Sequence, residues 1–231
     1  MDFKAVIFDL DGTLLDTLED IANSANNILA RHGFPTHDWN DYRDFVGDGL
    51  GMLVKRILPE DKQDNETVRK YLEEYIEEYS QNWNIATKPY YGVAETLDEL
   101  TALHIRLAVL SNKRHDYTKK CVTEFLPGWT FDMVLGQRDG IARKPDPIGA
   151  LQITEFMNLS PESILYVGDT AIDMKTAIAA GMYPVGALWG FRSMKELKSS
   201  GAKALIEQPQ EILSLLDKTG YQKEIKPLAS N

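Results

Sequence analysis

Five short apolar segments recur along the chain, and each ends on small or polar residues. They cover residues 4–9, 105–112, 131–137, 163–169 and 183–190. Between the later segments the apolar spacing changes to that of helices, over residues 114–126, 146–158 and 171–181. Because strands that alternate with helices form a parallel sheet covered on both faces, we expect a doubly wound, Rossmann-like α/β core.

A long helical interval interrupts this alternation. Residues 16–86 contain no strand candidate, only amphipathic helical sequence such as residues 17–33. Roughly seventy residues is far more than the dozen or so that a crossover connection needs. We therefore predict an inserted α-helical cap domain at 16–86, inside a core formed by residues 1–15 and 87–216. The last stretch, 217–231, has little apolar periodicity and is predicted to be a loosely held tail.

Composition and charge narrow the class of protein. A chain of 231 residues with 43% hydrophobic residues can bury one sizeable core and a smaller second one. Its net charge of -10 argues against a nucleic-acid or membrane partner, because polyanions would be repelled. The single cysteine, Cys121, cannot form an internal disulfide, and the first apolar run stops at Asp9, too early to span a membrane. We expect a cytoplasmic monomer or homodimer.

Two aspartates follow the first apolar segment directly. Asp9 and Asp11 are two positions apart, so in extended backbone they face the same side. Gly12 allows a sharp turn after them, and Thr13 can bond locally. Two convergent carboxylates are tolerable when a divalent cation neutralises them, and Mg²⁺ prefers oxygen ligands of this kind. A solvent-facing turn is the alternative for such a pair alone.

Further polar residues close the other segments. Asp169 ends the fourth segment and Asp173 lies four residues later, where a helix is predicted to begin. Taken singly, Asp169 could cap that helix and Asp173 could stabilise its dipole. Ligands of doubly wound sheets bind beyond the carboxyl ends of the strands, where Asp9, Ser111 and Asp169 are all expected.

Two candidates for phosphate binding follow from residue type. Ser111 begins a run of hydroxyl, amide and amine groups that continues with Asn112 and Lys113. Its hydroxyl and nearby backbone N–H groups can hold phosphate oxygens, although a serine there can equally cap a helix. Lys144 precedes a proline-marked helix start and supplies a point charge for a phosphate, although a lysine alone is more often a surface residue.

Taken in order, these motifs resemble the haloacid dehalogenase-like phosphohydrolase superfamily. The resemblance covers residues 3–190, and its helical insertion is similar to the cap of the phosphoglycolate phosphatase and β-phosphoglucomutase group. The matching stretches are DLDGT, LSN, KPDP and GDTAID. The resemblance implies that Asp9 is a nucleophile that forms an aspartyl-phosphate, and that Asp11 is the general acid and base.

The same resemblance implies the ligands of the metal and of the phosphate. Mg²⁺ would be bound by Asp9, the backbone carbonyl of Asp11, Asp169 and, mainly through water, Asp173. The transferring phosphoryl group would be held by Ser111 and Lys144, with Thr13 and Asn112 as further substrate-binding residues; Lys144 would also pair with Asp9.

The substrate is expected to be selected by the cap. Gly47 and Gly49 lie in a loop before a helical run, and such a loop offers backbone N–H groups to an anion. The stretch resembles one in the cap of phosphoglycolate phosphatases, although Asp48 is an unfavourable neighbour for an anion and a simple turn is the alternative. Arg56 and His32 are weaker candidates for cap contacts.

We therefore predict a Mg²⁺-dependent phosphomonoester hydrolase of a small phosphorylated metabolite, with 2-phosphoglycolate as the first candidate. A sugar-phosphate mutase would use the same Asp9 and Asp11, but the cap shows no strong basic cluster for a second phosphate. In a dehalogenase Asp11 would have no role, because displacement of a halide needs no such acid. The long insertion argues against a non-catalytic phosphoacceptor domain.

Overall fold

The computed structural model describes residues 2–216, and the predicted tail at 217–231 lies outside them. Its central feature is a six-stranded parallel sheet with the order β5-β4-β1-β6-β7-β8. The strands are β1 (Ala5–Phe8), β4 (Arg106–Arg114), β5 (Met133–Gln137), β6 (Ile164–Gly168), β7 (Tyr183–Ala187) and β8 (Ala204–Ile206). The predicted doubly wound α/β core is confirmed.

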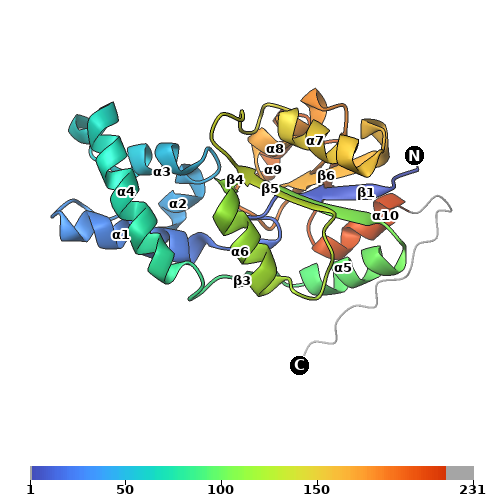
Figure 1. The fold of residues 1–231 in the computed structure, drawn as a ribbon, viewed down its shortest axis with the longest axis horizontal. Coiled ribbons are helices and arrows are strands. Elements are labelled where there is room, and N and C mark those ends of the chain that lie inside the picture. Colours follow the sequence, from blue (N-terminus) through green and yellow to red (C-terminus); the bar gives the residue numbers. More distant parts are fainter. Residues whose placement is uncertain (1, 217–231) are drawn as a thin grey trace.

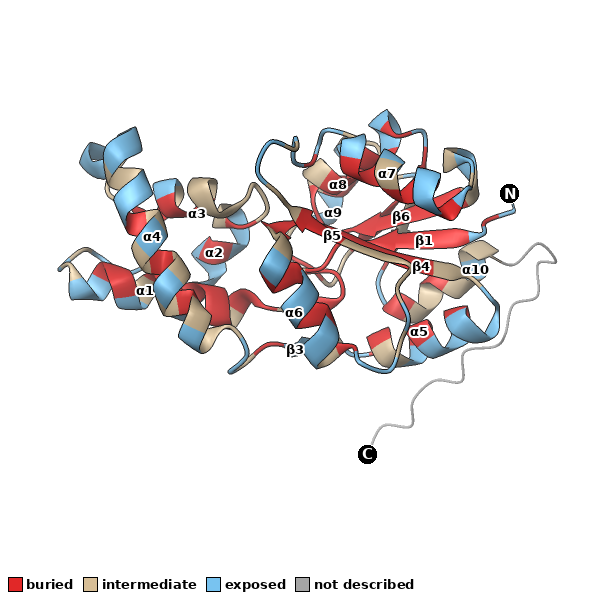
Figure 2. Cartoon of the chain, in the orientation of Figure 1, coloured by how far each residue is buried: buried red, intermediate tan, exposed pale blue. Residues whose placement is uncertain are grey.

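Helices cover both faces of this sheet (Figure 1). They are α5 (Val93–Ala102), α6 (His115–Phe125), α7 (Ile148–Met157), α8 (Ala171–Ala179), α9 (Met194–Ser199) and α10 (Ile212–Leu216), with short 3-10 turns at Pro161–Ser163 and Pro209–Glu211. Val6 and Phe8 of β1 pack with α5, α6 and α10, whereas Ala5 and Ile7 pack with α7 and α8. Strand β1 is thus buried on both sides, which explains its continuous apolar sequence (Figure 2).

The interval without strand candidates forms a separate group of helices beside the sheet (Figure 1). Its elements are α1 (Leu18–Arg31), α2 (Trp39–Phe45), α3 (Leu50–Ile57), a 3-10 turn (Glu60–Lys62) and α4 (Asn65–Asn82). These helices share a hydrophobic cluster of their own, to which Tyr71, Tyr75 and Tyr79 of α4 contribute one face at a spacing of four residues. Tyr117 and Phe191 of the sheet-bearing part join that cluster.

A short two-stranded ribbon connects the helical insert with the core. Strand β2 (Leu15–Asp16) leads into the insert and pairs antiparallel with β3 (Lys88–Pro89), which leads out of it. Asp20 of α1 stabilises this junction and is only 2% exposed. Its carboxylate accepts hydrogen bonds from the backbone N–H groups of Ala86 at 2.8 Å and Thr87 at 2.9 Å. It also accepts one from the Thr87 hydroxyl at 2.6 Å.

The structure adds two features to the expected elements. Neither the ribbon nor β8 was predicted, because strands of two or three residues are too short to show alternation. Strand β4 also extends to Arg114 and therefore includes Ser111, which was expected at its end. Within residues 2–216, none of the helices combines the length and apolar character that a membrane span requires.

Loss of the Asp20 carboxylate should destabilise the junction. We expect Asp20→Ala to lower the free energy of unfolding by about 2–3 kcal/mol, because it leaves buried donors of the returning chain unpaired. Urea-induced unfolding followed by circular dichroism measures the change. Asp61→Ala is the matched control: it removes an exposed carboxylate and should shift stability by no more than about 0.5 kcal/mol. Equal unfolding midpoints for the two variants would contradict this role.

Candidate active site

Three neighbouring strands bring their carboxyl ends together at the edge of the sheet nearest the insert. Strand β1 lies between β4 and β6, so the residues that follow these strands converge. The backbone N–H of Asp9 still donates to the carbonyl of Val167 at 2.9 Å, which places Asp9 beside the end of β6. Gly12 then turns the chain at a φ of 86°, where a Cβ atom would overlap the Asp169 carboxylate.

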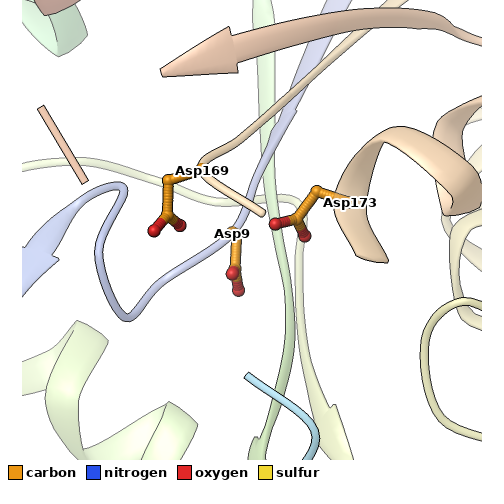
Figure 3. A group of neighbouring side chains, drawn as sticks. All are labelled: Asp9, Asp169 and Asp173. Carbon is orange, nitrogen blue, oxygen red and sulfur yellow. The ribbon is translucent and has the colours of Figure 1, made fainter. Parts of the chain in front are cut away.

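A cluster of three buried carboxylates forms at this point. Asp9, Asp169 and Asp173 each place one oxygen within 4.8 Å of the others (Figure 3). They come from separate segments: Asp9 follows β1, Asp169 follows β6, and Asp173 lies in the first turn of α8. Asp173 also completes a capping box with Thr170. It therefore stabilises the start of α8 and belongs to the carboxylate cluster as well. Asp169 is not the cap; Thr170 is.

Lys144 supplies the positive charge of this cluster. Its Nζ lies 2.7 Å from Asp173 Oδ1 and 2.9 Å from Asp9 Oδ1, and it donates to the carbonyl of Leu110 at 3.1 Å. The side chain is 5% exposed, so the alternative of a surface lysine is excluded. Burial alone would lower its pKa, but the pairs with Asp173 and Asp9 outweigh it and raise that pKa well above the usual value.

The charges of the cluster do not balance. Burial raises the pKa of Asp9 to about 7 even though Lys144 opposes the shift, and burial together with Asp173 and Asp9 raises the pKa of Asp169 well above its usual value. One ammonium group therefore faces three carboxylates in a region shielded from water. Because divalent hard cations take carboxylate oxygens as ligands, this donor set fits Mg²⁺.

The Asp11 carboxylate points away from that cluster. It accepts from the Thr17 hydroxyl at 2.8 Å and pairs with Lys113 Nζ at 3.1 Å, while Lys113 also donates to the Tyr79 hydroxyl at 2.8 Å. The adjacent aspartates thus have different partners, although both line the same pocket. The prediction for the metal concerned the Asp11 carbonyl oxygen, and that assignment stays a prediction.

The other predicted phosphate-binding residues surround the carboxylates. Ser111 lines the pocket, and its hydroxyl accepts from the backbone N–H of Lys113 at 3.2 Å. The amide of Asn112 is taken by protein groups, since it donates to the carbonyls of Gly47 and Lys144 and accepts from the Lys144 N–H. Thr13 donates to Asp169 Oδ1 at 3.0 Å. In this arrangement Asn112 and Thr13 bond to other residues of the site, and their role in substrate binding stays a prediction.

The glycine-rich loop of the insert lies over the same site. Gly47 and Gly49 line the pocket, and Arg143 of the core donates to the carbonyl of Asp48 at 2.8 Å. The Asp48 carboxylate pairs with Arg56 at 2.5 Å and is not part of the pocket wall. The acid that makes this loop unfavourable for an anion is therefore neutralised by its neighbour.

A pocket of about 640 Å³, counting the solvent at its mouth, lies between the insert and the core. The core contributes Asp9, Asp11, Ser111, Asn112, Lys113, Arg114, Tyr117, Thr170 and Phe191. The insert contributes Ile21, Val46, Gly47, Gly49, Leu50, Leu53, Tyr75 and Tyr79. Polar groups thus gather at the sheet edge, and apolar and aromatic side chains form most of the opposite wall.

Sequence reasoning missed several residues of this site. Lys113 was recognised as an amine beside Ser111 but was not assigned to the site, and Tyr75 and Tyr79 lie in the interval that was predicted only to be amphipathic helix. His32 pairs with Glu74 at 2.6 Å and, like Arg56, is absent from the pocket wall. These two candidate cap contacts are thus structural residues of the insert.

Comparison with known proteins agrees with this geometry. The family model described as Haloacid dehalogenase-like hydrolase matches residues 6–187. The phosphoglycolate phosphatase of Aquifex aeolicus is 30% identical over 218 residues, which cover 93% of this chain and 97% of that protein. The phosphoglycolate phosphatase of Nitrosospira multiformis is 32% identical over 221 residues, or 94% of this chain and 96% of its own.

Solved structures show the same architecture. A crystal structure of a protein from Lactobacillus delbrueckii subsp. bulgaricus shares 28% sequence identity and superposes with a TM-score of 0.87. The alignment covers 94% of this chain and 99% of that protein. The similarity therefore includes the helical insert as well as the sheet.

Mg²⁺ should stabilise the protein increasingly as pH rises. Between the unfolded pKa of Asp9, 3.8, and its folded value of about 7, the folded protein holds the extra proton, so the metal-free protein loses stability as pH rises through this range. Above it the ionised carboxylates repel one another and bind the cation. We expect the Mg²⁺-induced increase in Tm to grow from about pH 5 to about pH 8.

Differential scanning fluorimetry measures this increase, with NaCl of equal ionic strength as control. Asp169→Asn should abolish most of the Mg²⁺ effect while raising the Tm of the metal-free protein, since it removes both a ligand and a repulsive charge. A Mg²⁺ effect of the same size in wild type and Asp169→Asn would contradict the assignment.

Proposed function

Since the chain belongs to the haloacid dehalogenase-like hydrolase family, we propose that it is a Mg²⁺-dependent phosphatase acting on phosphomonoesters of small metabolites. The observation that carries the proposal is the cluster of Asp9, Asp169 and Asp173 with Lys144, beside a pocket whose wall includes Asp9 and Asp11. With Mg²⁺ bound, such a site could offset the charge of a phosphate dianion while holding a nucleophile and a proton donor.

Asp9 is the proposed nucleophile. Its Oδ1 accepts from the backbone N–H of Leu10 at 2.7 Å and pairs with Lys144, which fixes the carboxylate and leaves Oδ2 for attack on phosphorus. A bond forms from Oδ2 to phosphorus while the ester oxygen leaves, giving an aspartyl-phosphate and an alcohol. Water then cleaves the acyl-phosphate and releases inorganic phosphate.

Asp11 is the proposed general acid and base. It protonates the leaving alcohol oxygen and, in the second step, takes a proton from the attacking water. Thr17 and Lys113 hold its carboxylate in the pocket, which fixes the position from which the proton is given. Asp11 and Asp9 thus have different proposed roles, because Asp11 is held by Thr17 and Lys113 whereas Asp9 pairs with Lys144.

The phosphoryl group is held by the remaining residues of the polar end. Mg²⁺ bound by Asp9, Asp169 and Asp173 would supply charge neutralisation for the phosphate, and the Asp11 carbonyl is proposed as a further ligand. Ser111 and nearby backbone N–H groups face the phosphate oxygens. Lys144 orients Asp9 and compensates its charge.

We propose residues 16–86 as the cap domain and 2-phosphoglycolate as the first substrate to test. The names of the relatives support this substrate, and so does the position of Gly47 and Gly49 on the pocket wall. With Asp48 paired to Arg56, backbone N–H groups of the loop are proposed to bind a carboxylate; Arg114 also lines the pocket but is paired with Asp116.

A mutase is less well supported. It would have to hold a second phosphate on the cap, whereas the described residues of the insert that line the pocket include no lysine or arginine. Hydrolysis needs only one phosphate site, which we propose lies beside Asp9 and Ser111.

Replacing Asp9 and replacing Asp11 should have different effects on the hydrolysis of 2-phosphoglycolate and p-nitrophenyl phosphate. Asp9→Asn should abolish hydrolysis of every ester, because an amide cannot form the acyl-phosphate. Asp11→Asn should lower kcat for 2-phosphoglycolate by about 10²–10⁴-fold but affect p-nitrophenyl phosphate much less, because p-nitrophenolate leaves without a proton. Steady-state kinetics on both esters, with and without chelator, tests the proposal. Full activity of Asp9→Asn or of the chelated enzyme would refute it.

The cap loop should affect one substrate more than another. A Cβ atom at Gly49, whose φ is 87°, would lie 2.9 Å from Arg143 Nη1, so Gly49→Val displaces the loop. If the loop binds the carboxylate, KM for 2-phosphoglycolate should rise at least about tenfold, and KM for p-nitrophenyl phosphate should change little. Gly33→Val, at a positive-φ glycine with no neighbour within 4 Å, is the control for backbone strain. Equal increases on both esters would mean that the loop does not read the carboxylate.

A further inference from the structure

The wall of the pocket that faces the carboxylates is built for apolar atoms. Ile21, Leu50 and Leu53 of the insert form part of it, together with Tyr117 and Phe191 of the core. These side chains also belong to, or pack against, the hydrophobic cluster of the insert, so they are held in place by packing. A glycolate group has too little apolar surface to use such a wall, since the gain from burial scales with the apolar area covered.

One polar atom beside this wall has no partner. Tyr75 lines the pocket and is 1% exposed; its hydroxyl is buried and makes no hydrogen bond with any residue in the described part of the chain. Its ring stacks on Tyr79, with centroids 5.7 Å apart and an angle of 11° between the planes. The neighbouring hydroxyl of Tyr79, by contrast, accepts from Lys113.

An unpaired buried hydroxyl is costly, because it has lost its hydrogen bonds to water and gained none. Burial also raises the pKa of Tyr75 well above its usual value, so the group stays an uncharged donor and acceptor. A ligand atom that bonds to this hydroxyl recovers the lost interaction. An uncharged group can make this hydrogen bond without a compensating cation, and the described residues of the insert that line the pocket include no lysine or arginine.

We propose that Tyr75 is a specificity-determining residue for a second class of substrate. The class consists of phosphomonoesters of alcohols longer than glycolate, with an apolar middle and one uncharged hydrogen-bonding group at the far end. The phosphate lies at Asp9, the middle lies against the apolar wall, and the terminal group bonds to Tyr75. The inference rests on the proposed phosphatase reaction and adds to its range.

Two matched series of esters test this proposal: n-alkyl phosphates and ω-hydroxyalkyl phosphates, each from propyl to octyl. For wild type we expect kcat/KM to favour the hydroxylated ester about five- to tenfold at one chain length, the usual worth of a hydrogen bond between neutral groups. Tyr75→Phe should abolish this preference. Tyr71→Phe is the matched control, because Tyr71 lies one turn away on α4 and outside the pocket wall, so it should keep the preference.

A binding measurement separates this inference from the phosphatase reaction itself. The corresponding alkyl- and ω-hydroxyalkylphosphonates cannot be hydrolysed, and their effect on Tm reports binding even to an inactive protein. A larger shift with the hydroxylated phosphonate, lost in Tyr75→Phe, supports the proposal. No preference at any chain length, or the same preference in Tyr75→Phe, overturns it. Absence of p-nitrophenyl phosphate hydrolysis would instead refute the proposed function.

Discussion

The arrangement of the site depends on an unbalanced set of buried charges. Three carboxylates from β1, β6 and α8 meet in a region where water is excluded, and Lys144 compensates only part of their charge. Such an arrangement costs folding free energy unless further positive charge arrives. The surrounding structure holds the carboxylates in place. Parallel strands fix the backbone, and Asp169 accepts hydrogen bonds from the Thr13 hydroxyl and the Phe191 N–H. Asp173 accepts one from the Thr170 hydroxyl. The stability of the sheet offsets the free-energy cost of burying these charges.

The topology explains why the sequence predicted so much of this site. Asp9 and Asp169 directly follow β1 and β6, Ser111 lies three residues before the end of β4, and the order of these strands brings their ends together. The types of these residues then predict a metal bound by carboxylate oxygens and a bound phosphate. Lys144 lies in a loop, so the hydrophobic pattern alone could not place it: its pair with Asp9 was expected from the family resemblance, and its pair with Asp173 was found in the structure.

The contacts between the insert and the core were beyond sequence reasoning for the same reason. Asn112 joins the loop at Gly47 to the backbone of Lys144, although these residues are far apart in the chain. Tyr75 and Tyr79 follow a spacing typical of any buried helix face, so nothing in the pattern marks them as pocket residues. Their position depends on how the whole insert docks, and docking depends on many weak contacts that local periodicity does not encode.

The paired entry and exit of the insert have a consequence for how such proteins diversify. Both connections run side by side through β2 and β3, so the chain enters and leaves the helical part at neighbouring positions. A different set of helices could begin and end at that ribbon without altering a single strand of the sheet. Changes in these helices would leave Asp9, Asp169 and Asp173 in place, so in the proposed phosphatase the surface facing the alcohol can vary separately from the residues facing the phosphate.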